Sequence, residues 1–195
     1  MPLHAVDIGW ASSSESGSDP VSEFYTRHPY PPPVDNLDRA RDEWRDETRQ
    51  RAEYHLLWPG RPYRADLDIL VAGCGTWQAA KYALCRPEAR VVGIDISATS
   101  IEHTERLKQK YDLTNLAVRQ LPLENIGELE TRFDLIVCTG VLHHLADPEA
   151  GLRALRSAPD TRSIPAILIT ARTGEDATLE GLGSGADDFI IKPFS

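Results

Sequence analysis

The sequence has little of what marks secreted, membrane or metal-binding proteins. It holds only three cysteines, Cys74, Cys85 and Cys138, and neither their odd number nor their spacing fits a disulfide framework or a metal motif. It has no apolar run near the roughly 18 residues of a membrane span, and no basic N-terminus followed by an apolar core. We therefore expect buried or half-buried thiols, no membrane span, no signal peptide and a cytoplasmic location.

Positive charge is also scarce. Lysine and arginine number 21 against 30 acidic residues, which gives a formal net charge of −9. Such a chain has no overall attraction for phosphate backbones or anionic lipid, so we expect no nucleic-acid partner and no membrane partner. With 41% hydrophobic and 26% charged residues, the 195-residue chain has the composition and length of one well-buried domain with a small appendage.

The N-terminal third lacks the apolar patterning of a sheet. Residues 1–21 contain few large apolar groups, so we expect a disordered tail there. The prolines of residues 24–33 forbid helix and favour extended polyproline geometry. Residues 36–57 have apolar side chains near one face and charged ones on the other, which predicts a single helix that ends at Pro59-Gly60.

From residue 68 onward, buried strands alternate with helices. The predicted strands are 68–72, 91–95, 116–118, 133–138, 166–170 and 189–192. The predicted helices are 77–85, 98–111, 124–130, 147–157 and 175–183. This rhythm predicts an α/β fold with a doubly wound, mainly parallel, Rossmann-like sheet of about six strands and helices on both faces.

Ligands in such sheets bind beyond the carboxyl ends of the strands, where the strand order reverses. The loop Gly73-Cys74-Gly75 follows the first strand; its glycines permit a tight turn and close approach of a ligand, and helix N–H groups attract an anion. Asp95 ends the second strand, 20 residues after Gly75 (95 − 75). At that spacing an acid can accept hydrogen bonds from two ribose hydroxyls; the alternative is that Asp95 caps the helix that begins near Ser97.

A third loop follows the fourth strand. Thr139 and Gly140 are small and leave room beside a ligand, although an ordinary loop explains them equally. His143 and His144 follow, but neighbouring positions seldom aim two side chains at one point and no acidic or cysteine cluster completes a site. We therefore predict no metal site and expect packing or capping histidines, with a proton-transfer role as the lesser alternative.

Four segments together resemble a bacterial class I S-adenosylmethionine-dependent methyltransferase, a resemblance that spans residues from about 22 to 156. The matching segments are 30–33, 69–76, 92–95 and 133–148. The resemblance implies S-adenosyl-L-methionine as cofactor and methyl donor, and a small-molecule or other, unidentified methyl acceptor. Methyl transfer is an in-line displacement at an already activated carbon, so the protein mainly supplies orientation and we name no catalytic residue.

The resemblance also assigns roles residue by residue. It places Gly73, Cys74, Gly75, Asp95, Ile96, Thr139, Gly140 and Val141 at the cofactor. The two outer residues of the glycine loop would pass under the methionine part. Asp95 would hold the ribose, Ile96 would pack on the adenine, and the last three residues would line the donor cleft. The segment with Tyr25 and Tyr30 resembles the family's N-terminal lid.

Two positions depart from the family pattern near the cofactor. Trp77 stands where many members have a third glycine, so its indole either packs under the following helix or crowds the cofactor. Residues 119–122 replace an acid that many members place near the adenine amino group. That contact is either lost or taken by Gln120.

The last segment, residues 159–195, departs further: from about residue 163 to 195 it resembles the final third of a response-regulator receiver domain. The resemblance implies that Thr170 is the switch hydroxyl and Lys192 the phosphate-binding lysine, with a cis peptide bond before Pro193. The receiver's acidic pair and phospho-acceptor aspartate belong to earlier strands that are absent, and Asp187 and Asp188 stand in the wrong place to replace them. We therefore do not expect phosphorelay activity.

The chain thus divides into a tail, a methyltransferase-like core over residues 22–158, and a receiver-like strand–helix–strand segment expected to complete the sheet. The leading hypothesis is a methyltransferase. The alternatives are a receiver-like signalling or interaction module, or a truncated chimera that keeps the fold without activity. The oligomeric state is not readable from these patterns.

Overall fold

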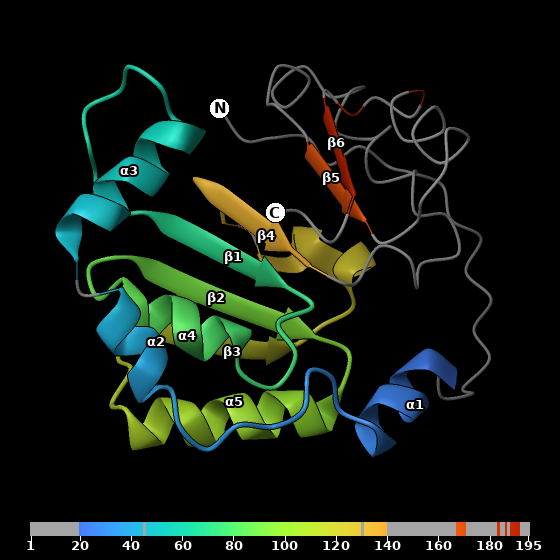
Figure 1. Cartoon of the computed structure of the whole chain (residues 1–195). Coiled ribbons are helices and arrows are strands. Elements are labelled where there is room, and N and C mark those ends of the chain that lie inside the picture. Colours follow the sequence, from blue (N-terminus) through green and yellow to red (C-terminus); the bar gives the residue numbers. More distant parts are fainter. Residues whose placement is uncertain are drawn as a thin grey trace. The chain divides into compact units, whose positions relative to one another are not determined.

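The computed structural model describes residues 20–44, 46–129, 131–139, 167–170, 183, 186 and 188–191 (Figure 1). The chain divides into two units, residues 1–140 and 141–195. The helices of the first unit are α1 (Pro20–Arg27), α2 (Asp38–Glu43), α3 (Glu47–Leu57), α4 (Gln78–Cys85), α5 (Ala98–Lys110) and the 3-10 segment η1 (Leu123–Leu129). Among the described residues, none of the helices has both the length and the apolarity that crossing a bilayer requires.

The first unit is built on a four-stranded parallel sheet. Its strands are β1 (Asp68–Ala72), β2 (Arg90–Asp95), β3 (Leu116–Gln120) and β4 (Leu135–Cys138), in the order β3-β2-β1-β4. The central strand β1 is apolar throughout its last four residues, and all four are fully buried. A strand needs such a run when both of its faces are covered, so the predicted parallel, Rossmann-like arrangement is confirmed.

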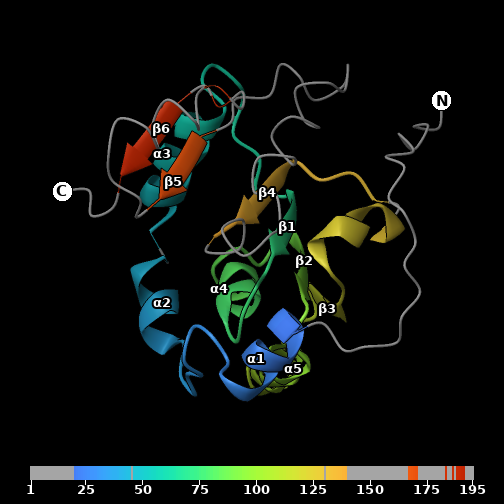
Figure 2. The same cartoon turned by 90° about the vertical axis from the view of Figure 1, so that its right-hand side faces the viewer.

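Side chains of β1 point alternately to the two faces of the sheet, and they pack in two separate core clusters. Ile69 and Val71 pack in one cluster with residues of α4 and α5, whereas Leu70 and Ala72 pack in another with residues of η1. Figure 2 shows α4 and η1 on opposite sides of the sheet. Successive side chains of a strand point to opposite faces, so each face needs its own cover. The predicted helices 77–85, 98–111 and 124–130 correspond to α4, α5 and η1.

The N-terminal predictions need two corrections. Residues 20–27 form α1, so residues 20–21 are not part of a disordered tail and residues 24–27 are not extended; residues 1–19 lie outside the described part. A proline constrains mainly itself and the residue before it, so the prolines from Pro29 onward do not prevent a helix that ends at Arg27. Pro20 itself stands at the first helical position, which proline tolerates.

The second correction concerns the predicted single helix over residues 36–57, which is two helices, α2 and α3. Asp46 caps α3: its side chain accepts a hydrogen bond from the N–H of Thr48 at 2.9 Å. A capping aspartate starts a new helix because it satisfies an N–H that the helix leaves unpaired. The amphipathic pattern continues across this break, so periodicity alone does not reveal it.

The segment between α1 and α2 runs along α5 (Figure 1). At one end, the Thr99 hydroxyl donates to the carbonyl of Thr26 at 2.9 Å. At the other end, the N–H of Leu37 donates to the Tyr111 hydroxyl at 2.7 Å. We call residues 25–37 the strap, because they are fastened at both ends of α5.

The second unit contains a separate parallel pair, β5 (Ile167–Thr170) and β6 (Asp188–Ile191). Six strands were predicted, and six are described. The first four pair with one another in the sheet of the first unit, and β5 and β6 pair with each other. The two units divide after Gly140, and the domain boundary predicted after residue 158 stays a prediction. Except for Gly183, which is helical, the predicted helices 147–157 and 175–183 lie outside the described residues.

Gly93 of β2 gives a direct test of how α4 packs on the sheet. A Cβ at this position would lie 2.7 Å from the Cβ of Ala79 and 3.3 Å from the Sγ of Cys74. Gly93→Ala should therefore lower the free energy of unfolding by about 1–3 kcal/mol, measured by urea denaturation. The double variant with Ala79→Gly should recover part of that loss beyond additivity. A Gly93→Ala protein as stable as the parent would contradict this packing.

Candidate functional site

The carboxyl ends of the four strands meet at one edge of the sheet, which we call the carboxyl edge. Ala72 of β1 pairs with Ile94 of β2 and with Cys138 of β4, and Asp95 pairs with Gln120 of β3. The loops that follow these strands therefore start side by side. Strand order reverses at β1, which lies between β2 and β4, and a doubly wound sheet binds ligands at such a point.

The loop after β1 requires its two glycines. Gly73 and Gly75 have φ angles of 66° and 55°, in the left-handed region that other residues rarely adopt. Gly75 is needed for a second reason, since a Cβ there would lie 2.6 Å from both the Cδ of Pro31 and the carbonyl oxygen of Tyr30. Glycine at position 75 therefore permits both the sharp turn and the close contact with the strap.

The carboxylate of Asp95 is held between two loops. Its Oδ2 accepts from the N–H of Gly75 and its Oδ1 accepts from the N–H of Ser97, each at 2.8 Å. Burial raises the pKa of Asp95 above its usual value, and the hydrogen bonds from the backbone offset part of that rise. Each carboxylate oxygen can accept a further hydrogen bond, so the group is fixed in orientation and retains capacity to bind donors.

The alternative role of Asp95, capping α5, is filled by another residue. Ser97 is the N-cap of α5, and its hydroxyl accepts from the N–H of Ser100 at 3.2 Å. Asp95 instead braces the turn that precedes the cap. The carboxylate of Asp95 is therefore not the cap of α5 and can still accept hydrogen bonds from a ligand.

The adenine side of the predicted site lies at the end of β3. The side-chain amide of Gln120 donates to the carbonyl of Ile96 at 2.9 Å, which ties the loop after β2 to the neighbouring strand. Because the amide nitrogen faces a carbonyl, the Oε1 of Gln120 is the atom left to accept a donor such as an amino group. The predicted packing of Ile96 on adenine stays a prediction.

Cys74 and Trp77 both turn toward the core. The Cys74 side chain is fully buried, and burial raises the pKa of its thiol far above the usual range, so Cys74 can offer a ligand only its backbone. Trp77 packs against the same core cluster, with the Lys81 ammonium 5.9 Å from its ring centre. Of the two alternatives for Trp77, the structure shows packing under α4.

The loop after β4 is only partly described. Thr139 is exposed at the carboxyl edge, directly after the end of β4. Gly140, Val141, His143 and His144 lie outside the described residues. Within the described part of the chain, no cluster of three or more histidine, cysteine, aspartate or glutamate side chains could hold a metal ion.

Hydroxyl groups fasten the strap to the carboxyl edge, and sequence patterns did not identify them. The Thr76 hydroxyl donates to the carbonyl of Pro31 at 2.8 Å, and the Ser97 hydroxyl donates to that of Tyr25 at 3.1 Å. Burial raises the pKa of Tyr25, and the charges of Tyr30 and Asp95 add to that effect. The strap therefore lies where the predicted lid should be. The only sequence signal was that each hydroxyl residue closely follows a glycine or acid already singled out.

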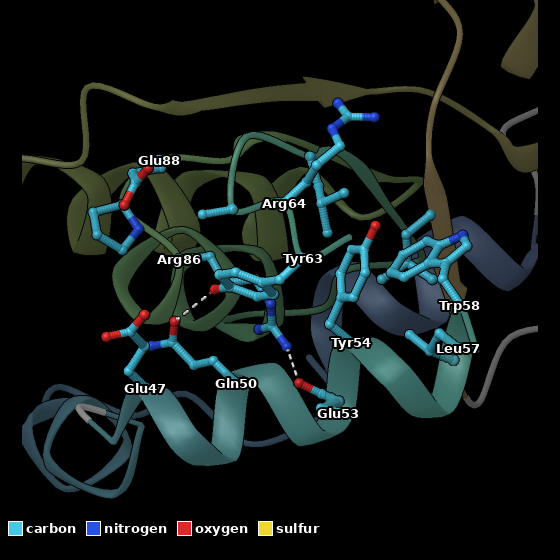
Figure 3. Close-up of a pocket in the computed structure, with 14 residues that line it drawn as sticks. Glu47, Gln50, Glu53, Tyr54, Leu57, Trp58, Tyr63, Arg64, Arg86 and Glu88 are labelled. Atoms are coloured by element: carbon cyan, nitrogen blue, oxygen red, sulfur yellow. Dashed lines mark hydrogen bonds and ion pairs between the residues drawn. The ribbon is translucent and has the colours of Figure 1, made fainter. Parts of the chain in front are cut away.

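A second hollow lies away from this edge. A cavity of about 290 Å³ is lined by α3 and by the segments that lead into β1 and β2, at the amino ends of these strands (Figure 3). Figure 3 shows Tyr54 and Tyr63 facing this space. Two pairs of its polar groups contact each other: Arg86 with Glu53, and the Tyr63 hydroxyl with Gln50 at 3.4 Å. The carboxyl edge remains the better candidate, because the glycine loop and Asp95 lie there.

Comparison with known proteins finds two kinds of relative. The phosphate regulon transcriptional regulatory protein PhoB of Rhizobium meliloti is 40% identical over 62 residues, which are 32% of this chain and 27% of that protein. An uncharacterised protein of Synechococcus sp. is 33% identical over 168 residues, 85% of this chain and 40% of the relative. A ubiquinone biosynthesis O-methyltransferase of Alkalilimnicola ehrlichii is 29% identical over 146 residues, 70% of this chain and 58% of that enzyme.

The chain thus spans between about a quarter and three fifths of the length of these curated relatives. Residues 70–159 match the family described as a methyltransferase domain. The matched range begins in β1 and includes the glycine loop, Asp95 and Thr139, the residues that the sheet brings to one edge. Over this range, the chain is similar to methyltransferase domains.

Proposed function

We propose that the first unit binds S-adenosyl-L-methionine at the carboxyl edge and that the protein transfers the methyl group to an acceptor. The observation that carries this proposal is the carboxylate of Asp95. It is held at both oxygens by the N–H groups of Gly75 and Ser97, beside the point where strand order reverses. A carboxylate so oriented suits a pair of neighbouring hydroxyls such as those of a ribose.

The residues present fit this cofactor. Gly73 and Gly75 present backbone without a side chain, and the first N–H groups of α4 follow them, where an amino-acid carboxylate can bind. Gln120 offers an acceptor for an amino group on the adenine side. When bound, the cofactor supplies a methyl group on a positively charged sulfur that is already activated for displacement. The contribution of the chain is then to orient the donor and to exclude water from it.

The methyl acceptor that we propose is a small molecule. The formal charge of −9 disfavours nucleic acid and anionic membranes as substrates. The strap is fastened over the carboxyl edge by Thr76 and Ser97, which supports an enclosed acceptor rather than a large one. The relative from Alkalilimnicola ehrlichii, named as an O-methyltransferase of ubiquinone biosynthesis, is in keeping with this class.

For the second unit we propose a structural role. The parallel pairing of β5 with β6 and the identity with PhoB support an origin of residues 159–195 in a receiver domain. Thr170 ends β5, as the switch hydroxyl of a receiver would; Asp187, Lys192 and Pro193 lie outside the described residues. Without the earlier receiver strands the segment has no phospho-acceptor, so we propose that it extends the α/β fold and does not receive phosphate.

Calorimetric titration with S-adenosylmethionine or its demethylated product, S-adenosylhomocysteine, tests the main proposal. We expect saturable binding, and we expect Asp95→Ala to weaken it by about tenfold or more, since hydrogen bonds to a charged group contribute about 1.5–3 kcal/mol. Asp66→Ala is the matched control, because Asp66 is an exposed carboxylate that pairs with Arg64 before β1. Absence of binding at millimolar ligand would overturn the proposal; binding that survives Asp95→Ala would overturn only the ribose assignment.

The pKa of Asp95 gives a second measurement, by carboxyl-carbon NMR with Asp95→Asn for assignment. In the free protein the pKa should lie above the ordinary value of 3.8, because burial disfavours the charge. The folded state then binds the extra proton, so the contribution of Asp95 to the free energy of unfolding is largest below pH 3.8 and falls as pH rises through the raised pKa. Saturating S-adenosylhomocysteine should lower that pKa, since ribose hydroxyls stabilise the carboxylate. A pKa unmoved by bound ligand would contradict the contact.

Incubation with acetyl phosphate tests the role of the second unit. We expect no gain of a phosphoryl group by intact-mass measurement, because the receiver's acceptor aspartate is absent. A PhoB protein treated in parallel is the positive control. An acid-stable or acyl-phosphate adduct on this chain would favour a signalling role instead.

A further inference from the structure

Two adjacent side chains of α5 hold the glycine loop from its buried side. The Thr104 hydroxyl lies 3.1 Å from the carbonyl oxygen of Gly75 and 3.0 Å from that of Thr76. The Nδ1 of His103 lies 2.8 Å from the same Thr76 oxygen. Thr104 is 0% exposed and His103 is 6% exposed, so no water competes for these carbonyls. No motif in the sequence pointed to either residue.

The chemistry of these contacts fixes their direction. A carbonyl oxygen only accepts, so the ring nitrogen of His103 that faces Thr76 must carry its proton, and the Thr104 hydroxyl must donate. Buried backbone carbonyls need such partners, because leaving one unpaired costs about 1–3 kcal/mol. The two side chains therefore bind the peptide groups of the loop in one orientation.

That orientation extends to the N–H groups of the same peptides. In a planar trans peptide, the carbonyl of one residue and the N–H of the next point in opposite directions. With the carbonyls of Gly75 and Thr76 directed at α5, the N–H groups of Thr76 and Trp77 must point away from α5. These two donors immediately precede α4, where an anion is stabilised by the helix start.

We infer that Thr104 and His103 are positioning residues, which orient the N–H groups of Thr76 and Trp77 toward the carboxylate of the cofactor's methionine part. The inference rests on the proposed function. It assigns the two halves of the ligand to different parts of the protein: Asp95 serves the ribose, whereas Thr104 and His103 act, through the loop backbone, on the amino-acid end.

The decisive comparison uses two ligands that differ only at that end. S-adenosylhomocysteine carries the amino-acid carboxylate, and 5′-methylthioadenosine keeps the nucleoside but lacks it. Thr104→Val keeps the shape of the side chain and removes the hydroxyl. We expect it to weaken the binding of S-adenosylhomocysteine by roughly tenfold, since the one donor that the two loop carbonyls share is lost. The binding of 5′-methylthioadenosine should change less than about threefold, whereas Asp95→Ala should weaken both ligands.

Matched variants separate positioning from loss of stability. Thr104→Ser keeps the hydroxyl and should restore affinity for S-adenosylhomocysteine to near the parent value. His103→Asn keeps an N–H donor near the position of Nδ1 and should bind more tightly than His103→Phe. Asn115→Ala removes a half-buried side-chain amide that contacts three carbonyls at the other end of α4, those of Ala83, Arg86 and Ala89. It should lower the melting temperature and leave both affinities of the folded protein unchanged.

The results distinguish this inference from the proposed function. A parent protein that binds neither ligand overturns both. A parent protein that binds S-adenosylhomocysteine, with Thr104→Val either unaffected or weakened equally for both ligands, overturns only the positioning role. Selective loss for the carboxylate-bearing ligand, with rescue by Thr104→Ser, supports it.

Discussion

The hydrogen bond from the Gly75 N–H to the Asp95 carboxylate is the contact on which the carboxyl edge depends. It joins the loop after β1 to the loop after β2. The pairing of β1 with β2 places these loops side by side but does not itself connect them. Gly75 can reach Asp95 because it adopts a left-handed conformation, and it can adopt that conformation against the strap because it has no Cβ. Replacing this one residue would therefore disturb the turn, the carboxylate and the strap together.

This arrangement has an energetic cost. Burial disfavours the charge on Asp95, and hydrogen bonds from the backbone compensate only in part. A group that serves stability alone would be better replaced by a neutral one, since a buried charge without full compensation destabilises a protein. An under-compensated carboxylate, already oriented, gains most from two further donors. When a diol donates to the carboxylate, the cost of the buried charge in the ligand-free protein is relieved, and this relief adds to the free energy of binding. A site is pre-organised in this sense.

Sequence patterns were informative where the chemistry is local. The apolar runs of β1 and β2, the glycines and the position of Asp95 at a strand end follow from periodicity and spacing, and the structure brings them together as expected. The break between α2 and α3 was missed, because amphipathicity continues across it and only the cap at Asp46 marks it.

The contacts that complete the site were missed for a different reason: each joins residues far apart in the chain. Thr76 reaches Pro31, and Ser97 reaches Tyr25, through single hydroxyls that look like ordinary loop and cap residues in the sequence. Thr104 and His103 look like polar interruptions of an amphipathic helix. Their function depends on facing the underside of the glycine loop, which only the packing of α5 decides.

The strap adds a last constraint on how a ligand can bind. Pro31 and Tyr30 already contact Gly75 on the side that a Cβ would occupy, so a ligand must approach this loop from the α4 start or displace the strap. The hydroxyls that fasten the strap belong to Thr76 and Ser97, each next in sequence to a residue that we assign to the ligand, Gly75 and Ile96. Any movement of the loop or of the turn after β2 is therefore transmitted to the strap. In the proposed function, these hydrogen bonds would couple donor binding to enclosure of the acceptor.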